Sequence, residues 1–234
     1  MQRLNVTASI KPVPNNGIVV IAIDGPAGAG KSTVAKILAQ KLGISYLDTG
    51  AMYRALTFKA MTNKVNLEDG AQLAQLALKT KIELKPVDGG LNIFLDGKDV
   101  SEDIRTVEVT NNTFYIARAP EVREIMVKWQ REIGEKQSVV AEGRDIGTVV
   151  FPHATKKFYL DAGFEERAQR RIKELREKGK EVDEKELQQE LGERDQKDFS
   201  RSVGPLKKAD DAIEIDSSGM TAEQSADILL KYIK

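Results

Sequence analysis

The sequence of 234 residues contains no cysteine and only one histidine, His153. The lack of cysteine excludes disulfide bonds, thiol chemistry and cysteine-ligated metal sites, and a single histidine cannot form a histidine metal cluster. A metal ion bound by this chain must therefore be held by oxygen ligands. There is also no excess charge of either sign, because 36 basic residues balance 36 acidic ones. No field of the whole molecule attracts nucleic acid, so any anion site must be built by local clusters of cationic side chains.

Long hydrophobic runs are absent as well. No stretch approaches 18 consecutive apolar residues, and the first sixteen residues lack the apolar core of a signal peptide. We therefore expect a soluble, cytoplasmic and monomeric protein that binds neither membranes nor nucleic acid. Residues 1–16 contain Pro12, Pro14 and two asparagines, and we expect them to form a disordered lead-in. With 41% hydrophobic residues, positions 17–234 suit one α/β domain.

A glycine-rich segment lies between an apolar run and a stretch of helical periodicity. It consists of Gly25, Pro26, Ala27, Gly28, Ala29, Gly30, Lys31, Ser32 and Thr33. Glycines at this spacing let backbone N–H groups turn toward phosphate oxygens, and the N-terminus of the following helix favours the same negative charge. Lys31 adds a cation, and Ser32 adds a ligand for Mg²⁺. The segment predicts a loop that binds the phosphates of a nucleoside triphosphate; the alternative is a simple turn between a buried strand and a helix.

Short apolar segments alternate with helical ones along the chain. Strands are predicted at residues 18–23, 44–47, 138–141, 156–160 and 212–215, and helices at 33–42, 51–60, 68–79, from 120 onward, 164–178 and 221–232. This alternation is typical of a doubly wound α/β fold with a five-stranded parallel sheet. Ligands of such folds bind beyond the carboxyl ends of the strands.

Two segments depart from this alternation. Between about residues 80 and 105 apolar and polar residues alternate, with turn signals at Asp88-Gly89-Gly90 and Asp96-Gly97, which predicts a small antiparallel insertion. Residues 179–202 are rich in charge and poor in apolar side chains, so we expect them not to anchor a core. They suit a lid that closes over a bound nucleotide and excludes water.

Arginines gather near the predicted strand ends. Arg54 follows the second strand, and Arg144 with Asp145 follows the third. Guanidinium groups can hold phosphates with paired hydrogen bonds and neutralise charge during phosphoryl transfer. The structural alternatives are an exposed helix arginine at position 54 and a simple ion pair at 144–145.

A second arginine group follows the fourth strand. Arg167, Arg170 and Arg171 fall at helical spacing and share one face of a helix that also carries many glutamates. These arginines suit the phosphates of a nucleotide under a lid. A solvated helix surface with local ion pairs is the alternative.

Four motifs, in this order, make the chain resemble bacterial cytidylate kinases from about residue 18 to the C-terminus. They are residues 23–32 (IDGPAGAGKS), 48–54 (DTGAMYR), 143–150 (GRDIGTVV) and 193–195 (ERD). The resemblance implies a P-loop kinase that uses ATP and Mg²⁺ to convert CMP or dCMP into CDP or dCDP. It also implies a monophosphate-binding region at residues 52–122, which contains the antiparallel insertion, and a helical lid at 165–202.

The resemblance also implies roles for individual residues. Thr49 and Arg54 are placed on the CMP side, with Arg54 on the acceptor phosphate. Arg123 and Asp145 are implied to read the cytosine edge, and Arg144 to support the CMP phosphate. The acceptor ribose and phosphates are assigned to Asp198 and Arg201, and the lid and the ATP phosphates to Arg170 and Arg194. The catalytic set is then Lys31, Arg144, Arg194 and Arg201.

The chain departs from the family pattern at two places. Glu142 stands before Gly143 where relatives often have aspartate, and Thr113 lies beside Phe114 where some relatives have a serine that contacts the base. Two other functions stay open at this point. One is a P-loop kinase with another acceptor, such as UMP, AMP or a shikimate-like alcohol, and the other is a nucleotide-binding switch.

Overall fold

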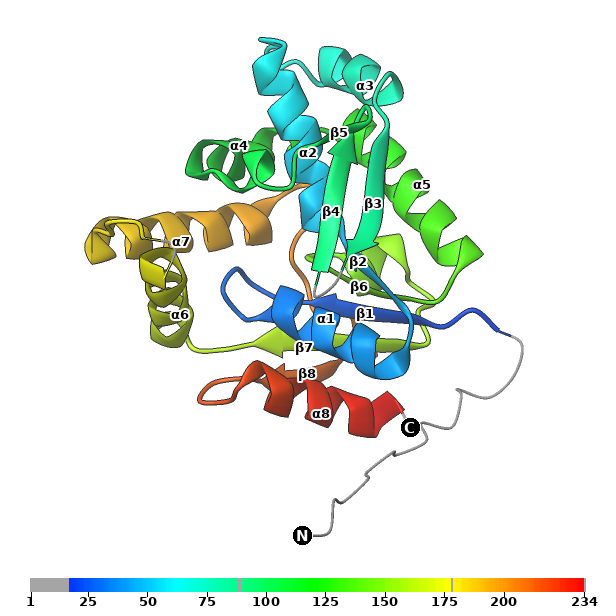
Figure 1. Cartoon of the computed structure of the whole chain (residues 1–234), viewed down its shortest axis with the longest axis vertical. Helices are drawn as coiled ribbons and strands as arrows, with labels where there is room; N and C mark the ends of the chain where they lie inside the picture. Colours follow the sequence, from blue (N-terminus) through cyan, green and yellow to red (C-terminus); the bar gives the residue numbers. More distant parts are fainter. Residues whose placement is uncertain (1–16, 88–89, 178, 234) are drawn as a thin grey trace, which may run out of the picture.

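A five-stranded parallel sheet forms the centre of the protein (Figure 1), and the computed structural model describes residues 17–87, 90–177 and 179–233. The strand order is β2-β6-β1-β7-β8. The strands are β1 (Val20–Asp24), β2 (Ser45–Asp48), β6 (Val139–Gly143), β7 (Lys156–Asp161) and β8 (Ile213–Asp216). The doubly wound parallel sheet is thereby confirmed. The expected lead-in at residues 1–16 and most of the turn signal at Asp88-Gly89-Gly90 lie outside the described residues.

Helices cover both faces of the sheet because side chains of a strand point alternately to opposite sides. Ile21 and Ile23 of β1 pack with α1 (Lys31–Leu42) and α8 (Ala222–Ile233) on one face. Ala22, between them, packs on the other face in a core formed with α2 (Thr49–Thr62), α3 (Gly70–Leu78) and α5 (Pro120–Lys136). The central strands are buried on both sides, which explains their continuous apolar runs.

A small antiparallel sheet confirms the predicted insertion. It consists of β3 (Ile82–Val87), β4 (Gly90–Leu95) and β5 (Lys98–Asp99), in that order. Ile93 and Val100 of this region pack against Ala51 and Ala55 of α2, together with Ile104 of the 3-10 helix η1 (Asp103–Arg105). The insertion is therefore seated on the helix that follows β2.

One helix of this region was not predicted, namely α4 (Val107–Arg118). The side chain of Thr106 caps it by accepting the N–H of Val109 at 3.2 Å. Most of its residues are polar or β-branched, and only Val109, Ile116 and Ala117 are buried. β-branched and short polar residues favour a helix only weakly, so the sequence gives little local indication of this helix, which packs against α2.

The helices α6 (Phe164–Glu177) and α7 (Glu184–Ser200) form an arm at the left of Figure 1. Leu191 of α7 packs with Ala168 and Phe164 of α6 and with Ala27 of the glycine-rich loop. The expectation that residues 179–202 do not anchor a core is therefore wrong in part, because Leu191 anchors the arm to the loop. None of the helices within the described ranges combines the length and apolar character needed to cross a membrane.

Candidate active site

The glycine-rich loop leaves the carboxyl end of β1 and faces the α6–α7 arm (Figure 1). Lys31, the first residue of α1, is only 5% exposed. Its Nζ donates a hydrogen bond to the carbonyl of Pro26 at 2.7 Å. The lysine thus folds back over its own loop, where a phosphate group would meet both the ammonium and the loop N–H groups.

Ser32 points to the neighbouring strand. Its hydroxyl donates to Oε1 of Glu142 at 2.8 Å, and Glu142 is the buried penultimate residue of β6. Tyr46 reaches the same carboxylate oxygen at 3.4 Å. A hydroxyl and a carboxylate beside a phosphate loop are oxygen ligands of the kind that Mg²⁺ prefers. No group of three or more acidic or histidine side chains within the described residues could hold a metal ion.

Arg54 and Thr49 lie at the start of α2, after β2. Asp48 caps this helix by accepting the N–H of Ala51 at 2.7 Å, and its other oxygen accepts a bond from Arg54 Nη2 at 3.3 Å. Thr49 donates its hydroxyl proton to the carbonyl of Glu142 at 2.7 Å. The side chain of Arg54 is only 18% exposed, so the alternative of an exposed helix arginine is wrong.

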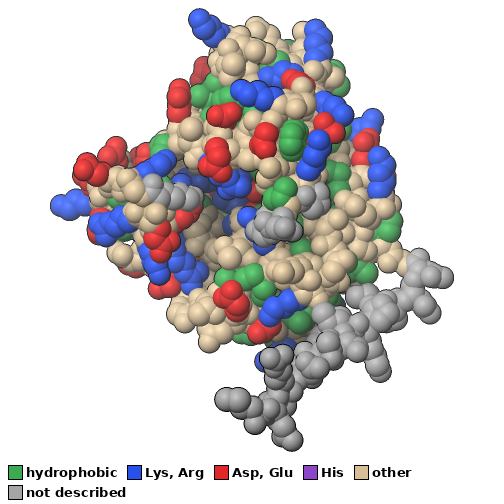
Figure 2. All heavy atoms as spheres, in the orientation of Figure 1, with side chains coloured by type: hydrophobic (Ala, Val, Ile, Leu, Met, Phe, Trp, Pro, Cys, Tyr) green, Lys and Arg blue, Asp and Glu red, His purple; other side chains and the backbone are tan. Residues whose placement is uncertain are grey.

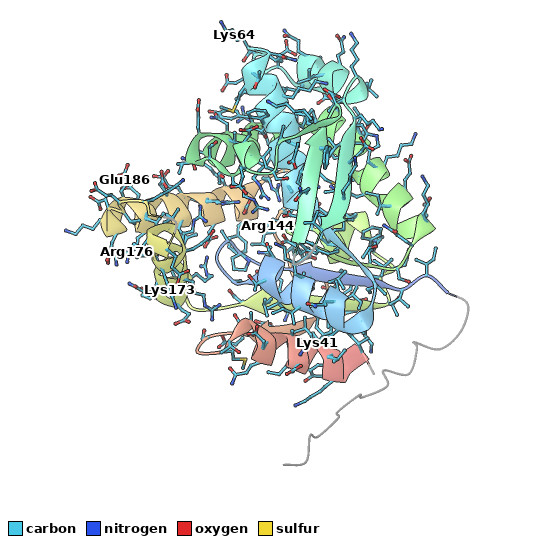
Figure 3. All side chains as sticks on the ribbon, viewed as in Figure 1. Lys41, Lys64, Arg144, Lys173, Arg176 and Glu186 are labelled. Carbon is cyan, nitrogen blue, oxygen red and sulfur yellow. The ribbon has the colours of Figure 1, made fainter. Side chains whose placement is uncertain are left out.

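Arg144 joins the sheet to the arm. Its Nε donates to Oδ2 of Asp198, near the end of α7, at 2.7 Å. Figure 3 shows Arg144 near the middle of the molecule, whereas Lys173, Arg176 and Glu186 lie on the outer part of the arm. In Figure 2, lysine and arginine side chains gather in a hollow between the arm and the rest of the protein.

Asp145 forms a buried ion pair with Arg123 of α5. The guanidinium also donates to the hydroxyl of Tyr53 and the carbonyl of Ala117, both at 3.4 Å. Gly204 lies directly against this pair with φ of +57°, and a Cβ at this position would overlap Arg123 Nη2 and Asp145 Oδ2. The segment after α7 therefore closes over the pair, and only glycine fits there.

The predicted face of Arg167, Arg170 and Arg171 does not act as one group. Arg167 is buried and binds the carbonyl of Ala27 at 2.9 Å and Asp195 at 2.6 Å. Arg170 donates to Ser217 and Glu166, and Arg171 pairs with Glu174 on its own helix. Arg167 and Arg170 both lie beside the loop, because Arg167 binds the carbonyl of Ala27 and Arg170 Nη1 lies 3.8 Å from where a Cβ of Gly30 would stand.

The buried charges alter one another's pKa values. Burial, with help from the charges of Arg144 and Arg194, lowers the pKa of Lys31 to about 7. Burial and the neighbouring Arg144 lower the pKa of Arg194 to about 10. Burial alone would raise the pKa of Asp198, but Arg144, Arg194 and Arg201 outweigh it and hold that pKa below its ordinary value. The centre therefore carries closely spaced cations that favour an anion.

Several arginine N–H groups of this centre are buried without an acceptor among the described residues. They are Nε of Arg54, Nε of Arg123, and Nε and Nη2 of Arg201. Buried donors are rarely left unpaired in native proteins, and leaving one so costs about 1 to 3 kcal/mol. The four atoms belong to arginines that the sequence placed on the acceptor side. They fit the oxygens of a bound phosphate or the polar edge of a base.

The structure shows which predicted residues meet. Arg54, Arg144, Arg194, Arg201 and Asp198 act on one another electrostatically, and Asp145 with Arg123 adjoins Arg201. Two contacts escaped the sequence analysis. Glu142 was noted there only as a departure from the family pattern, although it binds Ser32. Gly204 was not singled out. Both contacts join residues that lie far apart in the chain, and no local sequence pattern indicates such a contact.

Comparisons with known proteins give one family. The family model described as cytidylate kinase matches residues 21–234. A cytidylate kinase of Desulforamulus reducens is 51% identical over 214 residues, which cover 92% of this chain and 96% of the relative. One of Bacillus subtilis is 49% identical over 214 residues, with the same coverage. A crystal structure of an uncharacterized protein from Eubacterium ventriosum shares the fold at a TM-score of 0.52 and 16% identity, covering 93% of this chain and 98% of that one.

Lys31 gives a prediction about stability in the absence of ligand. Its pKa is about 7 in the folded protein and 10.5 in the unfolded chain, so between these values the unfolded state binds more protons and stability rises with pH. Lys31→Met removes this penalty. We expect it to raise the free energy of unfolding at pH 7 by about 1 to 3 kcal/mol, with the advantage shrinking toward pH 10.

Urea unfolding of both proteins at pH 7 and pH 9.5 measures this difference. Titrating groups that do not interact with Lys31 contribute equally to both proteins and cancel in this comparison. An advantage of the variant that is equal at both pH values, or a loss at pH 7, would contradict the lowered pKa of Lys31.

Proposed function

The chain belongs to the cytidylate kinase family, and we propose that its site transfers the γ-phosphoryl group of ATP to CMP or dCMP, giving ADP and CDP or dCDP. The observation that carries this proposal is the set of buried, unpaired N–H groups on Arg54, Arg123 and Arg201. These arginines come from α2, α5 and the end of α7 rather than from the phosphate loop, so the site has cationic donors for a second ligand besides the one that the loop binds. Family membership assigns these ligands as ATP and a cytidine monophosphate.

On the donor side, the loop of residues 25–33 binds the ATP phosphates through backbone N–H groups and Lys31. Lys31 exchanges its bond with the Pro26 carbonyl for the phosphates, whose charge raises the pKa of the ammonium from about 7. Arg170, beside Gly30, supplies a further cation. ATP therefore relieves the unfavourable burial of Lys31.

On the acceptor side, Arg54, Arg144 and Arg201 bind the monophosphate, with Thr49 and Asp198 beside them. Asp48 and Asp198 hold Arg54 and Arg144 in place in the absence of nucleotide. The acceptor needs no general base, because an oxygen of the monophosphate is already anionic near neutral pH. The role of the protein is to position this oxygen and to neutralise charge.

The base is read by the pair of Asp145 and Arg123. Cytosine presents an amino donor beside a ring acceptor, which matches a carboxylate that accepts and a guanidinium that donates. Uracil presents a carbonyl in place of the amine and meets the carboxylate with an acceptor. In the absence of nucleotide the two side chains satisfy each other, so a base must replace part of that contact. The hydroxyl of Thr113 donates to Val109 within α4, which makes a contact with the base less favourable.

Transfer takes place under the arm. Arg194 on α7 interacts electrostatically with Lys31 of the phosphate loop and with Arg144 and Arg54 on the acceptor side. We propose that Arg194 binds the phosphoryl group during its transfer and neutralises its charge. The arm is joined to the loop through Arg167, which binds both Ala27 and Asp195. A closed arm excludes water, which would otherwise accept the phosphoryl group.

Mg²⁺ fits beside Ser32, whose hydroxyl and the Glu142 carboxylate oxygen lie 2.8 Å apart at the loop. Bound there, the ion would neutralise negative charge on the phosphate oxygens. Ser32 would hold it directly, and Glu142 would hold it directly or through water.

We also propose that the protein acts as a monomer in the cytoplasm, with nucleotides rather than membranes or nucleic acid as its partners.

The experiment that tests the function is an assay of ADP release from ATP with CMP, dCMP, UMP, AMP and GMP as acceptors. We expect CMP or dCMP to give the highest kcat/KM, because cytosine matches both Asp145 and Arg123, uracil does not, and adenine offers the same donor and acceptor only on a larger two-ring base. A higher kcat/KM for AMP or GMP would overturn the acceptor, and ATP binding without transfer to any monophosphate would favour a switch.

Asp145→Asn tests the reading of the base. Asparagine keeps the shape but can donate to the carbonyl of uracil, so we expect the ratio of kcat/KM for CMP to that for UMP to fall about tenfold to hundredfold. The KM for ATP stays close to that of the wild type. Asp103→Asn, at an exposed position, serves as the control, and an unchanged ratio in Asp145→Asn would contradict the assignment.

Lys31→Met and Arg54→Ala separate the two phosphate sites. Each removes a cation aimed at developing charge, so we expect kcat to fall by roughly 100-fold or more, with the KM for ATP raised mainly in the first and the KM for CMP mainly in the second. Steady-state kinetics with both substrates varied measure this. Arg105→Ala, an exposed arginine in η1, should keep wild-type rates; wild-type turnover in either site variant would refute the mechanism.

A further inference from the structure

Asp24 is the last residue of β1 and directly precedes the phosphate loop. It is 3% exposed, and none of the roles described above uses it. Its Oδ1 accepts the backbone N–H of Ile146 at 2.7 Å, and its Oδ2 accepts that of Gly147, also at 2.7 Å. Both carboxylate oxygens are thus occupied by one segment of backbone that is more than a hundred positions away in the chain.

That segment directly follows the residues that recognise the acceptor. Ile146 and Gly147 open the π-helical turn η2 (Ile146–Val150), and Arg144 and Asp145 come immediately before it. The sequence predicts a strand before these two residues and a short tight turn at them, and the structure adds the π-helical turn that follows. The bonds of Asp24 therefore act on the backbone next to Asp145.

The turn of Arg144 and Asp145 is held at both ends. On one side, Gly143 pairs with Asp24 in the parallel ladder between β1 and β6. On the other side, the N–H groups of Ile146 and Gly147 bind the carboxylate of the same Asp24. One aspartate thus fixes the start and the end of the turn, and its own main chain continues into Gly25 of the phosphate loop.

The fit around the carboxylate is close. A Cβ at Gly147 would lie 3.3 Å from Asp24 Oδ2 and 3.1 Å from the Cδ atom of Lys157. Asp24 is also costly to bury, because desolvation, with a smaller contribution from Asp145, raises its pKa to about 7. A neutral side chain would avoid this cost if the position only filled space.

We propose that Asp24 is a positioning residue for acceptor recognition, which sets Arg144 and Asp145 at a fixed distance from the phosphate loop while touching neither nucleotide. The inference rests on the proposed function, because Asp145 must read the acceptor base. On this view, the Asp24 side chain connects the donor site to the acceptor site through its two hydrogen bonds to the backbone of Ile146 and Gly147.

Asp24→Asn is the direct test. The amide keeps one acceptor for Ile146 but turns an NH₂ group toward the N–H of Gly147. We expect the KM for CMP to rise, so that kcat/KM for CMP falls about tenfold to hundredfold and the preference for CMP over UMP falls with it, while kcat and the KM for ATP each change less than about threefold. Asp69→Asn is the matched control, since Asp69 likewise accepts a backbone N–H, from Gln72 at the start of α3, outside the site.

A double-mutant cycle distinguishes positioning from a general loss of structure. If Asp24 acts through Asp145, the variant with both Asp24→Asn and Asp145→Asn should show the same CMP to UMP ratio as Asp145→Asn alone. Two independent losses of selectivity that multiply would overturn the proposal. Equal loss of kcat/KM for ATP and for CMP in Asp24→Asn would also overturn it.

Gly147→Ala gives a second route if Asp24→Asn does not fold. Its Cβ pushes the turn away from an intact Asp24, and we expect the same rise in the KM for CMP with little change for ATP. Hydrogen exchange adds a readout independent of activity: in either variant, residues 143–150 should exchange faster and α1 should not. If the wild type prefers another acceptor in the monophosphate panel, the proposed function fails. The Asp24 inference is then tested with that acceptor. An unchanged KM for that acceptor in Asp24→Asn would overturn the inference.

Discussion

Burial of positive charge at the carboxyl ends of the strands is the constraint on which this structure depends. Cations removed from water must be compensated, and four arginines of the centre each pair with a carboxylate from another element: Arg144 with Asp198, Arg123 with Asp145, Arg54 with Asp48 and Arg167 with Asp195. These pairs also join the elements. Two of them fix α7 to the sheet side and to α6, so the position of the arm follows from the charge balance of the site.

The sequence predicted the fold correctly in those parts where the pattern of apolar and polar residues is local. The apolar runs of the buried parallel strands and the alternation of residues 80–105 report directly which way side chains point, and both predictions were confirmed. Helix α4 could not be predicted in the same way, because its few buried residues sit among polar and β-branched ones. The segment 179–202 was judged by its composition, and a single leucine, Leu191, was enough to give it a core contact.

The candidate site could be predicted only in part, because the sequence does not show contacts between residues that lie far apart in the chain. Strand ends of a parallel sheet lie at one edge, so the sequence alone grouped Arg54, Arg144 and the phosphate loop. Helical spacing put Arg167 and Arg171 on one face, but it could not tell that one of them turns inward to Ala27 and the other pairs with Glu174 along the helix. Asp24 and Gly204 have no local signature, because their partners come from distant parts of the chain.

The position of β1 in the sheet has a consequence for how the protein is made. This strand lies between β6 and β7, so Val20 pairs with Val139 and Ile21 with Lys156. During synthesis β1 leaves the ribosome without either neighbour and must wait until most of the chain has followed. Contacts of such wide sequence separation form slowly, since a long loop must close first. The phosphate loop is thus synthesised well before the strands that support it, and a chain interrupted before β6 contains an apolar strand, β1, without its neighbours in the sheet.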